Sequence, residues 1–219
     1  MKNIAVILSG CGYLDGAEIR ESVLTLLALD QEGVSYKIFA LNQDQHHVVN
    51  HLTGEESEGN KRNILEEAAR IARGKIEDIA KLNTNEFDAL VIPGGFGVAK
   101  NMCSFAFSGS HASVNEQVLN QIKAFKGANK PIGAICIAPA LLALSIGHDK
   151  PTLTIGTNSE IASEIEKTGA IHKNCITSEC VVDMEHKIVT TPAYMTDDAK
   201  LSDTYLGISK LVKKVVELA

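Results

Sequence analysis

The stretch PIGAICIAPALLAL, residues 131–144, holds the pattern that decides the fold. Its apolar first residues predict a buried strand over 131–136, and a helical segment over 138–147 begins within two residues of the strand end. Pro139 suits the first turn of a helix, where its missing N–H costs no hydrogen bond. We therefore expect a strand, a sharp turn that carries Cys136, and a helix.

Strand-like and helix-like segments alternate along the rest of the chain. This order predicts an α/β fold with a doubly wound, mostly parallel sheet between helices, and the near-continuous apolar strands predict burial on both faces. Segment 42–59 is the least structured, and residues 1–219 are expected to form one domain. The predicted strands are 3–9, 34–40, 87–93 and 153–156 with a hairpin over 180–192 whose loop is 184–187, and the predicted helices are 17–33, 60–74, 113–130, 158–169 and 198–218.

Composition excludes several classes of protein. The chain has 219 residues and a formal net charge of -6, which argues against nucleic acid or an anionic membrane as the main partner. No apolar run approaches the roughly 20 residues that a membrane span needs. The apolar core of the first residues is also too short for a signal peptide. The odd count of five cysteines favours free thiols in a reducing compartment, so we expect a cytoplasmic protein.

Two interpretations of Cys136 are open from the pattern alone. A thiol between a strand and a helix is typical of a nucleophile elbow. The helix N-terminus would then favour the thiolate and lower the pKa of the thiol by roughly one unit. The alternative is structural, because a free cysteine is among the most buried residue types and packs as a small apolar group.

A glycine pair follows the strand predicted at 87–93. Gly94 and Gly95 in IPGGFG, residues 92–97, would let the backbone approach a ligand and present N–H groups to an anion, although a tight turn alone would also need them. If the elbow lies in the same sheet, the N–H groups of Gly95 and Ile137 are the natural donors of an oxyanion hole.

The first loop and helix raise the question of a buried carboxylate. Asp15 and Glu18 have the spacing of a helix N-cap and its third residue, which predicts a capping box. Glu21 stands at the head of a helical row with Leu24 and Ala28, on a helix that is apolar almost all round. Such a carboxylate is costly unless it is protonated or partnered, but a solvated helix end would also explain it.

The histidines do not form a convincing metal site. His47, His51 and Glu55 could share a metal only on one continuous helix, and Gly54 predicts that a helix ends first. We expect a polar loop there and neither a metal nor a cofactor.

With these motifs together, the chain resembles the ElbB-type glyoxalases, also called enhancing-lycopene-biosynthesis or isoprenoid-biosynthesis proteins with an amidotransferase-like domain. They belong to the PfpI and class I glutamine amidotransferase-like superfamily. The resemblance covers nearly the whole chain, and its motifs are LSGCGYLDGAEI, VVNHLTGE, IPGGFGVAKN, CIAPA, LTIGT and IVTTPAYM.

The resemblance implies a flavodoxin-like sandwich, an elbow at Cys136, and a Glu of the first helix bonded to it, which falls on Glu21. It also implies oxyanion donors at the PGG turn and at Ile137, a cofactor-free conversion of glyoxal to glycolate, and a possible homodimer. Amidotransferases and the protease branch carry histidine directly after the cysteine or in a later loop, whereas the residue after the cysteine here is Ile137, which argues against glutaminase or protease activity. On this basis we expect a protonated Glu21 beside a Cys136 thiolate that forms a hemithioacetal. The alternatives are a cysteine-based redox sensor, an accessory protein of isoprenoid metabolism with little activity, and an amidotransferase-like partner subunit.

Overall fold

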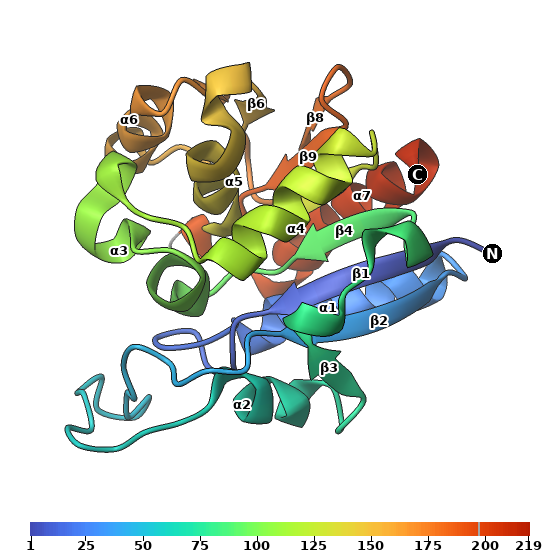
Figure 1. The fold of residues 1–219 in the computed structure, drawn as a ribbon. Helices are drawn as coiled ribbons and strands as arrows, with labels where there is room; N and C mark the ends of the chain where they lie inside the picture. Colours follow the sequence, from blue (N-terminus) through green and yellow to red (C-terminus); the bar gives the residue numbers. More distant parts are fainter. Residues whose placement is uncertain (197) are drawn as a thin grey trace.

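The computed structural model describes residues 1–196 and 198–219. Its main sheet has seven strands in the order β3-β2-β1-β4-β5-β9-β8, and all neighbours are parallel except β8 and β9. The predicted flavodoxin-like, mostly parallel sheet is therefore confirmed (Figure 1). The strands are β1 (Asn3–Leu8), β2 (Ser35–Ala40), β3 (Ile76–Asp78), β4 (Ala89–Ile92), β5 (Ile132–Ile135), β8 (Val181–Asp183) and β9 (Ile188–Thr191).

Helices cover both faces of this sheet. Helices α1 and α7 pack against each other on one face, where α7 also contacts β5 and β9, while α4 and α5 pack together on the other face. In Figure 1, α4 lies in front of the sheet and α7 behind it. This double cover explains why every residue of β4, β5 and β9 is buried. The helices are α1 (Ile19–Gln31), α2 (Ile64–Ile71), α3 (Phe105–Ser108), α4 (Glu116–Gly127), α5 (Ala138–Ile146), α6 (Ser159–Lys167) and α7 (Leu201–Leu218).

The strand predicted over 153–156 is wrong in place and length. The structure has β6 (Thr152–Leu153), which pairs with β7 (Ile171–His172) in a separate two-stranded sheet, because β9 occupies the position beside β5 in the main sheet. The chain turns away after β6, and Gly156 adopts a φ of +90° that favours glycine.

Several short elements have no clear sequence pattern. Edge strand β3 has only three residues, and a π-helical turn η3 (Val98–Met102) follows the PGG motif, with α3 after it. Segment 42–59 contains no helix or strand, as predicted.

Helix α1 is apolar almost all round in sequence but is not buried all round. Ile19 and Val23 lie on a half-exposed face, with 46% and 49% of their surface accessible. Only the opposite side of α1, which includes Glu21 and Leu29, is fully buried because it faces the sheet and α7.

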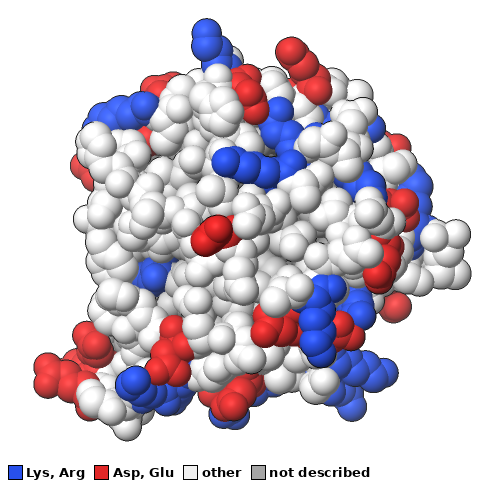
Figure 2. Space-filling view, in the orientation of Figure 1, with Lys and Arg blue, Asp and Glu red and all other residues white. Residues whose placement is uncertain are grey.

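Charges of both signs are interspersed around the face seen in Figure 2, and its centre is largely uncharged. Among the described residues, no helix is long and apolar enough to cross a membrane.

Candidate active site

The candidate site lies where four neighbouring strands end. The carboxyl ends of β1, β4, β5 and β9 lead into the segments 9–18, 93–97, 136–137 and 192–196. Ligands of open α/β sheets bind at this edge. The elbow, the glycine pair, and the LSGCGYLDG and TTPAYM motifs therefore meet at one place.

Cys136 occupies the turn between β5 and α5 in a strained conformation. Its φ is +62°, in the left-handed region, and its backbone N–H donates to the Thr191 carbonyl at 3.0 Å. A residue with a side chain in this region costs on the order of 1–3 kcal/mol, and such strain is concentrated at functional sites. Helix α5 begins at Ala138 with Pro139 in its first turn, as the sequence predicts. The thiol lies at the turn expected of a nucleophile elbow and is 7% exposed.

Glu21 reaches Cys136 from the first turn of α1. Its side chain is fully buried, and the Gly94 N–H donates to Oε2 at 3.0 Å. The Tyr194 N–H donates to Oε1 at 3.3 Å, so the TTPAYM turn helps to hold this carboxyl group. The carboxyl group also lies close enough to the Cys136 thiol for each group to shift the pKa of the other. The solvated helix end considered for Glu21 is thus excluded.

Gly94 has no room for a side chain at this contact. An added Cβ would lie 2.4 Å from Cys136 Cβ and 2.6 Å from Glu21 Oε2. The glycine is therefore required by the close approach of the thiol and the carboxyl group, because real Cβ contacts are longer.

The predicted capping box is wrong in its assignment. Glu18, not Asp15, is the N-cap of α1, and its carboxylate accepts the Glu21 N–H at 2.6 Å. Asp15 is fully buried in the preceding loop and accepts the Val49 N–H at 2.7 Å. A long-range hydrogen bond thus claims the residue that local spacing assigns to the cap.

Burial dominates the electrostatics of the pair. Desolvation, followed by the charge of Glu18, raises the pKa of Glu21 to about 8, although hydrogen bonds from Tyr194, Cys136 and Gly94 oppose the rise. Desolvation, followed by the nearby Glu21, also raises the pKa of the Cys136 thiol well above its usual value. The expected fall in the thiol pKa at the helix N-terminus is therefore wrong in direction, because a helix end contributes less than full burial of the charge costs.

Two backbone N–H groups favour the thiolate of Cys136. Those of Gly95 and Ile137 lower the pKa of its thiol by hydrogen bonding, which partly offsets burial. Gly95 has a φ of +101°, and a Cβ there would lie 2.3 Å from the Glu18 nitrogen. The glycine pair thus presents donors where negative charge would develop on or beside the sulfur.

A cavity of about 770 Å³ opens beside Cys136. The sequence did not single out most of its lining residues, which come from segments far apart in the chain. They are Gly12, Tyr13, Glu18, Ile19, Arg20, His51, Gly95, Phe96, Ile137, Asn158, Ile161, Tyr194 and Met195. For Tyr194, the only sequence feature that could have predicted a place in the cavity wall is its position just after a strand.

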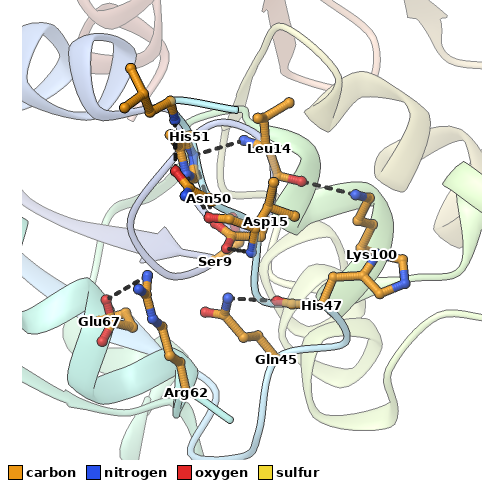
Figure 3. Close-up of polar contacts among 12 residues, drawn as sticks. Ser9, Leu14, Asp15, Gln45, His47, Asn50, His51, Arg62, Glu67 and Lys100 are labelled. Atoms are coloured by element: carbon orange, nitrogen blue, oxygen red, sulfur yellow. Dashed lines mark hydrogen bonds and ion pairs between the residues drawn. The ribbon is translucent and has the colours of Figure 1, made fainter. Parts of the chain in front are cut away.

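The NHLTGE motif supplies part of the cavity wall through His51, whose polar contacts are drawn in Figure 3. His51 Nε2 accepts the Leu14 N–H at 3.2 Å, so the ring proton lies on Nδ1 and donates to the Val49 carbonyl at 3.1 Å. Lys100 Nζ donates to the Leu14 carbonyl at 2.9 Å from the other side. The His51 ring also packs edge-on against Tyr13, with centroids 5.5 Å apart. The motif therefore fixes loop 9–18.

The two histidines considered as metal ligands face different partners. His47 Nε2 lies 3.7 Å from Glu56, whereas His51 Nε2 lies 3.8 Å from Asp15. Across the described residues, no group of three or more His, Cys, Asp or Glu side chains is arranged to hold a metal ion.

Comparison with known proteins identifies the family. A family model described as "DJ-1/PfpI family" matches residues 14–200. The chain belongs to the DJ-1/PfpI family. It is 42% identical over 224 residues to the "ES1 protein homolog, mitochondrial" of Rattus norvegicus, covering 98% of this chain and 83% of the relative. It is 43% identical over 224 residues to the "Glutamine amidotransferase-like class 1 domain-containing protein 3, mitochondrial" of Homo sapiens, covering 98% and 82%.

Solved structures of this DJ-1/PfpI family agree with the observed fold. The chain resembles the crystal structure of an isoprenoid biosynthesis protein with amidotransferase-like domain from Ehrlichia chaffeensis, with a TM-score of 0.92, 44% identity, and coverage of 100% of this chain and 99% of that one. Drosophila melanogaster DJ-1beta shares the fold at a TM-score of 0.58 and 19% identity, with coverage of 100% and 95%. The resemblance to the isoprenoid-biosynthesis proteins with an amidotransferase-like domain is thereby confirmed.

Proposed function

We propose that this protein is a cofactor-independent glyoxalase that converts glyoxal to glycolate through a hemithioacetal on Cys136. One observation carries the proposal: a strained, buried cysteine lies beside a fully buried carboxyl group at Gly94, and the N–H groups of Gly95 and Ile137 lower the pKa of its thiol. The pair provides a nucleophile and a proton carrier, and the N–H groups of Gly95 and Ile137 provide an oxyanion hole.

The reacting form of the pair carries a single negative charge. With a pKa of about 8, Glu21 is mostly protonated at pH 7, and the minor ionised form can accept the thiol proton as the sulfur attacks. A C–S bond forms to one aldehyde carbon, and the N–H groups of Gly95 and Ile137 hold the resulting alkoxide. Glu21 then returns the proton to this oxygen, which leaves a neutral hemithioacetal and an ionised carboxylate.

The same carboxylate moves the second proton. Glu21 removes the C–H proton of the hemithioacetal carbon and delivers it to the neighbouring carbon, while the hydroxyl proton passes between the two adjacent oxygens. The product is the glycolyl thioester of Cys136. Water then forms a C–O bond as the C–S bond breaks, which releases glycolate and restores the pair. Oxidation of one carbon balances reduction of the other, so the reaction needs no external oxidant or reductant.

Glycolate production by the purified protein tests the proposal. Initial rates are measured with glyoxal after treatment with a chelator, for the parent protein and for Cys136→Ser and Glu21→Gln. The control is Cys180→Ser, which changes a partly buried thiol that does not line the cavity. We expect each of the first two variants to lose at least about 100-fold in rate, the usual contribution of general acid–base catalysis, and Cys180→Ser to retain the parent rate. Equal rates in Cys136→Ser and the parent would refute the mechanism.

The redox alternative has its own outcome. A peroxide would oxidise Cys136 to sulfenic and then sulfinic acid, and a protonated Glu21 could donate to the new oxygen. Selective oxidation of Cys136 by dilute peroxide, found by mass spectrometry together with no glycolate, would favour a sensor. Since Cys136 is 7% exposed, the glyoxalase proposal instead expects the half-exposed thiols to oxidise no more slowly than Cys136.

We also propose that the protein is located in the cytoplasm. Free thiols persist in a reducing compartment, which supports this location. The two relatives named above are called mitochondrial.

A further inference from the structure

The cavity beside Cys136 is too large for glyoxal alone. Glyoxal has four non-hydrogen atoms, whereas about 770 Å³ lies in the range of roughly 300–1,000 Å³ that suits ligands of drug size. A substrate that filled only the space next to the sulfur would leave most of the cavity to water. The unused volume must therefore be considered in naming the substrate.

The walls of this volume are mainly apolar. The apolar and aromatic side chains come from five separate segments of the chain: Tyr13, Ile19, Phe96, Ile161, Tyr194 and Met195. The polar part of the lining comprises Glu18, Arg20, His51 and Asn158. Apolar walls favour an apolar occupant at roughly 25 cal/mol for each Å² removed from water.

Three of these side chains are about half exposed. Tyr13, Phe96 and Ile19 have 49%, 47% and 46% of their surface accessible, and all three line the cavity. Single exposed apolar side chains are normal, but exposed apolar side chains that lie together mark interaction or ligand-binding sites. The wall is also held in place, because His51 packs on Tyr13 and hydrogen-bonds Leu14.

We infer that the preferred substrate is a vicinal dicarbonyl with an aromatic or branched apolar substituent, whose aldehyde carbon meets Cys136 while the substituent fills the cavity. This inference rests on the proposed function. The reaction remains balanced, because oxidation of the aldehyde carbon accompanies reduction of the ketone carbon. The sulfur bonds to the aldehyde carbon, and the C–H proton moves from that carbon to the ketone carbon. The thioester is then hydrolysed to a 2-hydroxy acid.

Phenylglyoxal is the test substrate, and its product is mandelate. Initial rates of mandelate and glycolate formation give kcat/KM for phenylglyoxal and glyoxal in the parent protein and in variants. We expect kcat/KM to be at least about tenfold higher for phenylglyoxal, since one methylene in an apolar pocket already changes it by 10-fold or more. A ratio at or below one would overturn the inference.

Phenylglyoxal and glyoxal differ in chemical reactivity, and this difference cancels when the ratio of their kcat/KM values is compared between variants. Ile161→Trp on α6 should fill the cavity and lower the ratio of phenylglyoxal to glyoxal kcat/KM at least tenfold. Ser163→Trp, an exposed position on the same helix that does not line the cavity, should leave the ratio unchanged. If Ile161→Trp does not fold, Met195→Trp narrows the cavity from η6 (Ala193–Met195) instead. An unchanged ratio in a folded, narrowed variant would contradict the inference.

A binding measurement separates this inference from the proposed function. Mandelate and glycolate are compared as protectants of Cys136 against alkylation by iodoacetamide, which requires no turnover. We expect mandelate to protect at a concentration at least tenfold lower than glycolate. If neither dicarbonyl is turned over, the proposed function fails. The protection experiment would still show whether the cavity prefers a ligand with an apolar substituent. Equal protection would overturn it.

Discussion

Replacing Glu21 by glutamine should change how stability depends on pH. In the folded protein burial raises the pKa of Glu21 to about 8 from its ordinary value of 4.5, so the folded state binds this proton more tightly than the unfolded chain. Below pH 4.5 both states are protonated and nothing is lost. As the pH rises from 4.5 to 8, the unfolded chain releases the proton first, and the folded protein becomes progressively less stable.

The size of this effect follows from the two pKa values. The difference 8 − 4.5, at about 1.36 kcal/mol per pH unit, corresponds to a loss on the order of 5 kcal/mol above pH 8. Between pH 5 and pH 8.5 the loss is about 4 kcal/mol, because part of the transition lies outside that interval. This is a large fraction of the roughly 5–15 kcal/mol that stabilises a typical domain.

Urea unfolding at pH 5 and pH 8.5 measures the effect. In Glu21→Gln the side-chain NH₂ group faces the N–H of Gly94 or Tyr194, so one of these hydrogen bonds is lost. This loss lowers the unfolding free energy by about 1–3 kcal/mol at both pH values, so it cancels when the two conditions are compared. We expect the unfolding free energy of the variant, relative to the parent, to rise by about 4 kcal/mol between the two conditions. Glu66→Gln, at an exposed site on α2, is the control and should show no such rise. Parallel curves for Glu21→Gln and the parent would refute the assignment of a buried carboxyl group with a raised pKa.

Three further predictions follow from the geometry of the pair. Gly94→Ala should cost about 1–3 kcal/mol of stability and abolish glycolate formation, because its Cβ has no room, whereas Gly127→Ala, with nothing within 4 Å, should keep both. Alkylation of Cys136 by iodoacetamide should speed up between pH 6 and pH 8, and at pH 9, where Glu21 is ionised, Glu21→Gln should react faster because the opposing carboxylate is gone; equal rates at pH 9 would contradict the coupling. In thermal melts Cys136→Gly should be at least as stable as Cys136→Ala, the reverse of the usual order, because φ is +62°; a clear advantage for alanine would argue against the strain.

Much of the framework could be predicted from local patterns. The apolar run before Cys136 and the placement of Pro139 identify β5, the elbow and α5, because burial on both faces and helix-capping chemistry leave direct traces in sequence. The hairpin loop at 184–187 is also confirmed, with β8 ending at Asp183 and β9 beginning at Ile188.

Features that depend on distant segments could not be predicted. Asp15 has the spacing of a helix cap, but the Val49 N–H, 34 residues away, takes its carboxylate, and Glu18 caps the helix instead. The pKa of Cys136 depends on how much protein surrounds the thiol, which helix position alone does not report. The cavity walls could not be found because Tyr13, Phe96 and Ile161 converge only through the fold.

The hydrogen bonds from His51 and Lys100 to Leu14 bear on how this protein can diversify in evolution. Cys136 and Glu21 stand on the sheet and its packed helices, whereas the wall at Tyr13 is held by a few contacts from His51 and Lys100 to a loop. Segment 42–59, which carries His51, contains no helix or strand, so insertions and exchanges there need not disturb the core. Under the proposed function, selection could therefore alter which aldehydes enter while the reacting pair is inherited intact, and transplanting this segment between relatives would carry substrate preference with it.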